Sequence, residues 1–135
     1  MSQTAHEPFD AVRRLLIVDD DTALARMLAW SFEDLGYEVL TAVDCGSARR
    51  LARAARPAHA LIDCHLPDGD GHSLASELAA ARPALQIVLM SADHDAGRHD
   101  AGSASGAQRF FAKPVYPAQL HRLFTTGATP MVPLL

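Results

Sequence analysis

The sequence has few cysteines, no long apolar run and no apolar signal segment, and each of these absences excludes a class of protein. It has two cysteines in 135 residues, and Cys45 and Cys64 fit neither a CxxC pair nor a zinc-ligand spacing. We therefore exclude a disulfide framework and expect two packed thiols. No apolar run is long enough to cross a membrane. The first ten residues contain Glu7 and Asp10 and no apolar signal segment, so we expect a cytoplasmic protein without membrane contact.

The chain also lacks a basic patch, and its 12 basic and 16 acidic residues give a net charge of −4. Direct nucleic-acid binding is therefore not expected. With 49% hydrophobic and 21% charged residues, the chain is typical of one globular domain. We expect a flexible N-terminus over residues 1–12, a domain over 13–126, and a Pro-containing apolar tail or linker stub over 127–135.

Apolar segments alternate with helical segments along the domain. The expected strands are 14–19, 38–42, 58–63, 85–90 and 108–112, and the expected helices are 22–35, 45–55, 71–82 and 116–126. This alternation predicts an α/β fold, with a parallel sheet and helices on both of its faces. Ligands of such sheets bind at the carboxyl ends of the strands.

The first expected helix has clear end signals, with Asp21 as the N-cap and Gly36 at the C-terminal cap. Asp44 is expected to cap the second helix. Four large apolar residues predict the buried stripe of the first helix: Leu24, Met27, Leu28 and Leu35. Trp30 lies off this stripe, so we expect it to be half exposed.

Polar side chains follow the apolar strands at the carboxyl ends: Asp19, Asp20, Asp63, Ser91 and Lys113. Carboxylates brought together repel each other, and a hard divalent cation such as Mg²⁺ relieves that repulsion. Asp63 stands alone at a strand end and is the natural nucleophile toward a phosphoryl group. Lys113 and Ser91 can contact phosphoryl oxygens.

Each of these residues also has an ordinary explanation. The run Asp19 to Asp21 can cap the following helix, Asp63 can begin a turn, and Lys113 can be a solvated lysine. Their joint placement at strand ends, in chain order, favours a common site.

Four segments resemble the receiver domain of two-component response regulators, the CheY-like superfamily, over about residues 13–126. They are residues 16–21 (LIVDDD), 62–71 (IDCHLPDGDG), 90–92 (MSA) and 106–114 (GAQRFFAKP). The resemblance implies a doubly wound (βα)5 flavodoxin-like fold with a five-stranded parallel sheet of order 2-1-3-4-5.

The resemblance also implies a set of site residues. Asp63 would be phosphorylated by a sensor histidine kinase or a histidine phosphotransfer protein. Mg²⁺ would be held by Asp19, Asp20, Asp63 and the backbone carbonyl of His65. The other implied roles are phosphoryl binding by Ser91 and Lys113, an aromatic switch at Phe110, and tuning of dephosphorylation by His65 and Asp93. A downstream effector protein is the implied output, and catalysis is confined to self-phosphorylation and self-dephosphorylation.

The chain departs from the family pattern between residues 93 and 107. This segment has Gly97, Gly102 and Gly106 and no Leu, Ile, Val, Phe or Met. Because each interior glycine costs about 1 kcal/mol relative to alanine, we expect a weak or frayed fourth helix.

Two other functions stay open at this point. One is a degenerate receiver that binds partners without phosphorylation, which the intact set of acidic residues, Ser91 and Lys113 disfavours. The other is a Mg²⁺-dependent phosphohydrolase with an aspartate nucleophile, which typically has a second acid where this chain has His65. The domain can signal by protein contact, relay phosphate, or belong to a larger regulator or hybrid kinase.

Overall fold

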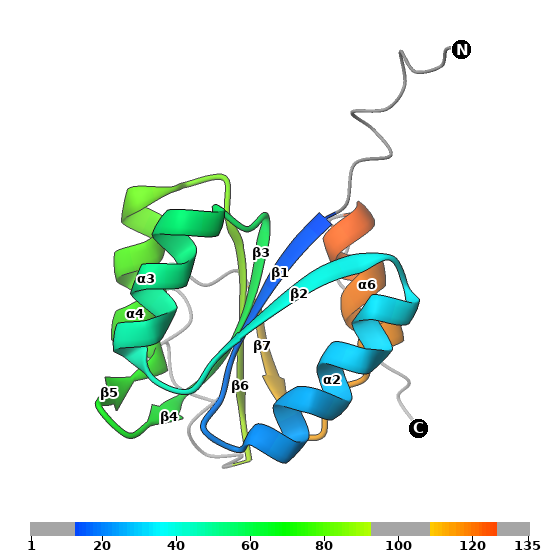
Figure 1. The fold of residues 1–135 in the computed structure, drawn as a ribbon, viewed down its shortest axis with the longest axis horizontal. Helices are drawn as coiled ribbons and strands as arrows, with labels where there is room; N and C mark the ends of the chain where they lie inside the picture. The colour runs from blue at the N-terminus through cyan, green and yellow to red at the C-terminus, as the bar shows by residue number, and fades with distance from the viewer. Residues whose placement is uncertain (1–12, 93–108, 127–135) are drawn as a thin grey trace.

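The computed structural model describes residues 13–92 and 109–126, which form one sheet covered by helices on both faces (Figure 1). In chain order the elements are β1 (Arg13–Val18), α2 (Thr22–Asp34), β2 (Tyr37–Ala42), α3 (Cys45–Ala55), β3 (His59–Asp63), β4 (His65–Leu66), β5 (Gly69–Asp70), α4 (Gly71–Ala81), β6 (Gln86–Ser91), β7 (Arg109–Ala112) and α6 (Pro117–Thr126). Each predicted element in the described ranges is present. The short antiparallel hairpin β4–β5 was not predicted.

The five sheet strands are parallel and lie in the order β2-β1-β3-β6-β7. Counted along the chain this is the order 2-1-3-4-5, so the predicted fold is confirmed. Because Val18 of β1 pairs with Ile62 of β3, the next residues, Asp19 and Asp63, come out at the same edge of the sheet.

The two faces of the sheet form separate core clusters, because successive side chains of a strand point to opposite sides. Leu16 and Val18 pack with buried residues of α3 and α4. Leu15 and Ile17 pack with buried residues of α2 and α6. Figure 1 shows these helix pairs on opposite sides of the sheet. A strand buried on both faces explains the uninterrupted apolar run of β1.

The predicted stripe of α2 is only partly right. Leu28 is buried, but Met27 is 60% exposed and Leu35 is 41% exposed. The buried face consists of Ala25, Leu28, Ala29 and Phe32, a spacing of three and four residues that keeps one side of the helix toward the sheet. The prediction counted large apolar side chains and overlooked the alanines. Trp30 is 60% exposed, as its place off the buried face requires.

The predicted caps are confirmed by their hydrogen bonds. The Asp21 carboxylate accepts from the Leu24 N–H at 3.1 Å, and the Asp44 carboxylate accepts from the Ser47 N–H at 2.8 Å. Gly36 follows α2 with a φ of 99°, a conformation that favours glycine.

Several predictions lie outside the described residues. These are the flexible N-terminus over 1–12, the weak or frayed fourth helix within 93–107, and the tail over 127–135. Within the described ranges, no helix is long and apolar enough to cross a membrane.

A buried histidine lies at the amino end of β3, away from the carboxylates. The His59 ring stacks on Phe124 with centroids 4.3 Å apart and meets the Tyr37 ring edge-on. Burial, and secondarily the positive charge of Arg13, lower the pKa of His59 to about 4. A hydrogen bond with Gln86 opposes the fall in the His59 pKa, and the charge of His121 adds to it. The native protein therefore holds His59 neutral in an aromatic setting.

We predict that His59 makes the protein acid-sensitive. The unfolded chain binds a proton at this residue below about pH 6.5, whereas the folded protein does so only near pH 4, so stability falls as the pH drops through this window. Between pH 7 and 4.5 the free energy of unfolding should lose about 2 kcal/mol more in wild type than in His59→Phe. Urea unfolding at both pH values measures this, and parallel losses would contradict it.

Candidate metal and phosphoryl site

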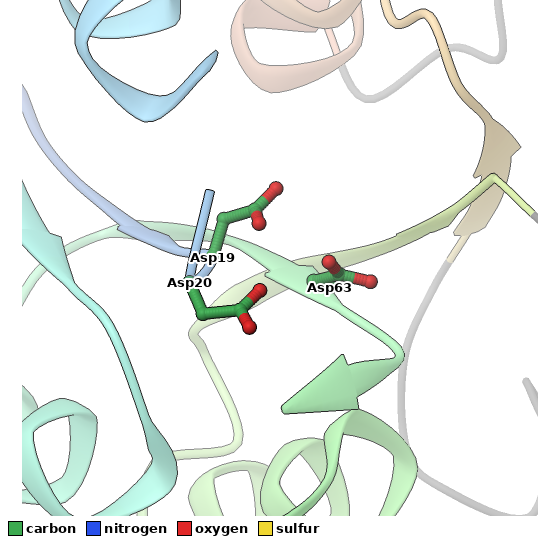
Figure 2. A group of neighbouring side chains, drawn as sticks. All are labelled: Asp19, Asp20 and Asp63. Carbon is green, nitrogen blue, oxygen red and sulfur yellow. The ribbon is translucent and has the colours of Figure 1, made fainter. Parts of the chain in front are cut away.

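Three carboxylates meet at the carboxyl edge of the sheet. Asp19 follows β1 and is 1% exposed, Asp20 is exposed, and Asp63 ends β3 and is 7% exposed. One carboxylate oxygen from each lies within 4.8 Å of the others. Figure 2 shows the three side chains beside one another, near the ends of two neighbouring strands. The predicted gathering of these acids is therefore what the structure shows.

Lys113 links two of these carboxylates. It directly follows β7, and its Nζ donates to Asp19 Oδ2 at 2.8 Å and to Asp63 Oδ2 at 3.1 Å. Its backbone N–H donates to the Ser91 carbonyl at 2.8 Å, which fixes the chain where β7 ends beside β6. The sequence predicted Lys113 at this edge but not the bridge between the two acids.

The electrostatics reflect this crowding. Burial raises the pKa of Asp19, and the negative charge of Asp63 raises it further, whereas the hydrogen bonds from Lys113 and from the Asp21 backbone oppose the rise. Burial alone would lower the pKa of Lys113, but its hydrogen bonds to Asp19 and Asp63 raise it overall. Lys113 is therefore a cation at neutral pH.

The backbone around Asp63 orients its carboxylate. The His65 N–H donates to Asp63 Oδ1 at 3.1 Å. Just beyond, the Gly71 N–H donates to the Cys64 carbonyl at 2.8 Å. A Cβ at Gly71 would overlap the carbonyl oxygen of Asp63, so the start of α4 can approach the strand end only as glycine. This close approach holds the two ends of the loop between β3 and α4 together, directly beside Asp63.

The other predicted site residues are not members of the group formed by the three carboxylates and Lys113. Ser91 is fully buried at the end of β6, the strand between β3 and β7. Phe110 is half-buried and packs against the core cluster under α3 and α4. The His65 side chain is exposed. Asp93 lies outside the described residues.

Both cysteines are buried thiols, as predicted. Burial raises the pKa of Cys45 and of Cys64 to about 11. Because the reactive form of a cysteine is the thiolate, neither is a nucleophile at neutral pH.

The donor set suits a hard divalent cation. All the gathered side-chain donors are carboxylate oxygens, with no thiol or imidazole among them. Lys113 and the backbone N–H groups of Asp21 and His65 each use a lone pair on these oxygens, and each oxygen keeps a second one. The residues therefore fit a cation such as Mg²⁺.

Comparison with known proteins shows the family of the chain. The response regulator receiver domain family matches residues 15–125. The chain belongs to this family. Among its relatives, the photosynthetic apparatus regulatory protein RegA of Cereibacter sphaeroides is 31% identical over 118 residues, covering 87% of this chain and 64% of RegA. The transcriptional regulatory protein PrrA of Mycobacterium tuberculosis is 34% identical over 107 residues, covering 79% of this chain and 46% of PrrA.

Solved receiver structures share the fold. A CheY-like receiver domain protein from Methanospirillum hungatei superposes with a TM-score of 0.76 at 28% identity, covering 87% of this chain and 94% of that one. A response regulator from Burkholderia pseudomallei, solved with a phosphorylated aspartic acid, a calcium ion and citrate, gives a TM-score of 0.77 at 26% identity, with 85% and 68% coverage.

The Lys113 bridge should contribute more to stability than an exposed ion pair. Without metal, at pH 7, Lys113→Met should lower the free energy of unfolding by about 2 kcal/mol, because it leaves two buried carboxylates without their shared cation. Arg14→Met breaks the exposed pair with Glu38, 3.1 Å long, and should cost under about 1 kcal/mol. Urea unfolding compares the two variants, and equal losses would contradict the prediction.

Proposed function

We propose that this receiver domain accepts a phosphoryl group on Asp63 from a sensor histidine kinase or a histidine phosphotransfer protein in the cytoplasm. The single observation that carries the proposal is the contact of Asp63 with Lys113 inside the group of three carboxylates. A buried acid beside a fixed cation and further acids has the charges that a dianionic phosphoryl group and a divalent cation together require.

Groups of the protein itself orient the Asp63 carboxylate for its attack on phosphorus. The His65 N–H and the Lys113 ammonium hold its two oxygens, so little rearrangement precedes bonding to phosphorus. A new P–O bond forms as the P–N bond to the donor histidine breaks, and the electron pair leaves with the imidazole nitrogen. Lys113 and the Ser91 hydroxyl then bind phosphoryl oxygens.

Asp19, Asp20, Asp63 and the backbone carbonyl of His65 would hold Mg²⁺. When bound, it neutralises charge on the carboxylates and on the transferring phosphoryl group. Support comes from the oxygen-only donor set and from the Burkholderia pseudomallei regulator, whose structure contains a calcium ion and a phosphorylated aspartate.

Ser91 and Phe110 form the proposed switch. A phosphoryl group shifts a two-state equilibrium only if it contacts one state better than the other. Ser91 is buried beside the acceptor strand, and Phe110 is half-buried on the next strand. Inward movement of Phe110 as Ser91 turns to the phosphoryl group would change the face offered to an effector protein. His65 and Asp93 would tune self-dephosphorylation.

We predict covalent phosphorylation from a small donor. Incubation with phosphoramidate and Mg²⁺ should add one phosphoryl group to the wild type and none to Asp63→Asn, because the amide is not a nucleophile toward phosphorus. Intact-protein mass spectrometry measures the gain. A folded wild type that binds Mg²⁺ but gains no mass would support a degenerate receiver instead.

The exposed member of the acidic group should also be needed for metal binding. Asp20→Asn should weaken Mg²⁺ binding at least about tenfold, since even partners outside the ligand shell typically contribute that much. Asp34→Asn, at the far end of α2, is the matched control for loss of one negative charge. Calorimetric Mg²⁺ titration of the three proteins measures this, and similar affinities in both variants would show that Asp20 is no ligand.

A further inference from the structure

The N-terminus of α3 is capped by acids from two different segments. Asp44 caps it locally through the Ser47 N–H. Asp68, more than twenty residues later, accepts from the Cys45 N–H at 2.7 Å with Oδ1 and from the Gly46 N–H at 3.1 Å with Oδ2. Two consecutive helix amides thus bind one carboxylate, an arrangement that the positive end of the helix dipole also favours.

Asp68 belongs to the hairpin β4–β5. It lies in the turn between the two strands, in which His65 pairs with Asp70 and Leu66 pairs with Gly69. Here too the hairpin lies close to the helix, because a Cβ on Gly69 would be 3.2 Å from the Cys45 Sγ. The Asp68 carboxylate therefore fastens this hairpin onto α3.

The same hairpin begins at the phosphoryl site. Its first residue, His65, donates its N–H to Asp63 Oδ1 at 3.1 Å. In the proposed function, the carbonyl of His65 is also a metal ligand. A shift of the hairpin therefore moves a donor to the acceptor carboxylate and a ligand of the cation together.

We propose that Asp68 is a positioning residue that holds the β4–β5 hairpin against α3 and thereby sets the affinity of the acidic site for Mg²⁺. The inference rests on the proposed function. Asp68 acts through the backbone of His65 and touches neither the cation nor the phosphoryl group. The hydrogen bond from the Cys45 backbone lowers the pKa of its carboxyl, so the contact is charged at neutral pH.

The test is a Mg²⁺ titration followed by backbone amide resonances in NMR. Asp68→Ala should weaken Mg²⁺ binding about tenfold, the effect typical of a residue that orients a metal ligand. Asp68→Asn keeps an oxygen for the Cys45 N–H and should recover most of the affinity, to within about threefold of wild type.

Asp44→Ala is the matched control, because it removes the other cap of the same helix and leaves the hairpin contact intact. Both alanine variants should lower the urea midpoint of unfolding by a similar amount, because each removes one cap of the same helix. Only Asp68→Ala should lose Mg²⁺ affinity. If both variants weaken binding equally, the effect is helix destabilisation and the inference is wrong.

A second measurement applies even if Asp68→Ala does not fold. Mg²⁺ added to the wild type should shift the amide resonances of Cys45 and Gly46 as well as that of His65, because the hairpin links them. Movement at His65 alone would overturn the inference. Phosphorylation of wild-type Asp63 by phosphoramidate is scored separately, so failure of the proposed function is distinguished from failure of this one.

Discussion

The arrangement of this protein depends on one interaction, the bridge from Lys113 to Asp19 and Asp63. Two carboxylates that are nearly inaccessible to solvent repel each other, and burial disfavours their charged forms. A lysine that donates to both, at 2.8 and 3.1 Å, offsets that cost. Because the partners lie at the carboxyl ends of β1, β3 and β7, the bridge needs these parallel strands in register, and the site exists only in the folded chain.

Much of the candidate site was predictable, because a parallel sheet brings residues from the ends of separate strands to the same edge. An acid after each of two apolar runs and a lysine after a third must converge once the strands are parallel, and the order β2-β1-β3-β6-β7 places them together. Local signals were equally informative at Asp21 and Asp44, because a capping side chain contacts amides only a few residues away.

The features that the sequence did not predict depend on packing and on contacts between distant segments. The buried face of α2 uses Ala25 and Ala29, and Met27 is left in solvent, because close packing on a sheet rewards small side chains that hydrophobicity patterns undervalue. The Asp68 cap of α3 joins segments more than twenty residues apart. A contact of that kind depends on tertiary geometry, so neither periodicity nor spacing indicates it.

The donors around the carboxylates also leave lone pairs through which this group of acids could hold a metal ion. Asp19 Oδ1 accepts from the Asp21 N–H at 2.9 Å and Asp63 Oδ1 from the His65 N–H at 3.1 Å, while Lys113 holds the Oδ2 atoms. Each oxygen keeps a lone pair for a cation. The orientation of both acids is therefore fixed by these hydrogen bonds, so a cation could bind without a search for new side-chain positions. Because two of these donors are backbone groups, the geometry of the site depends on how the loops after β1 and β3 are held.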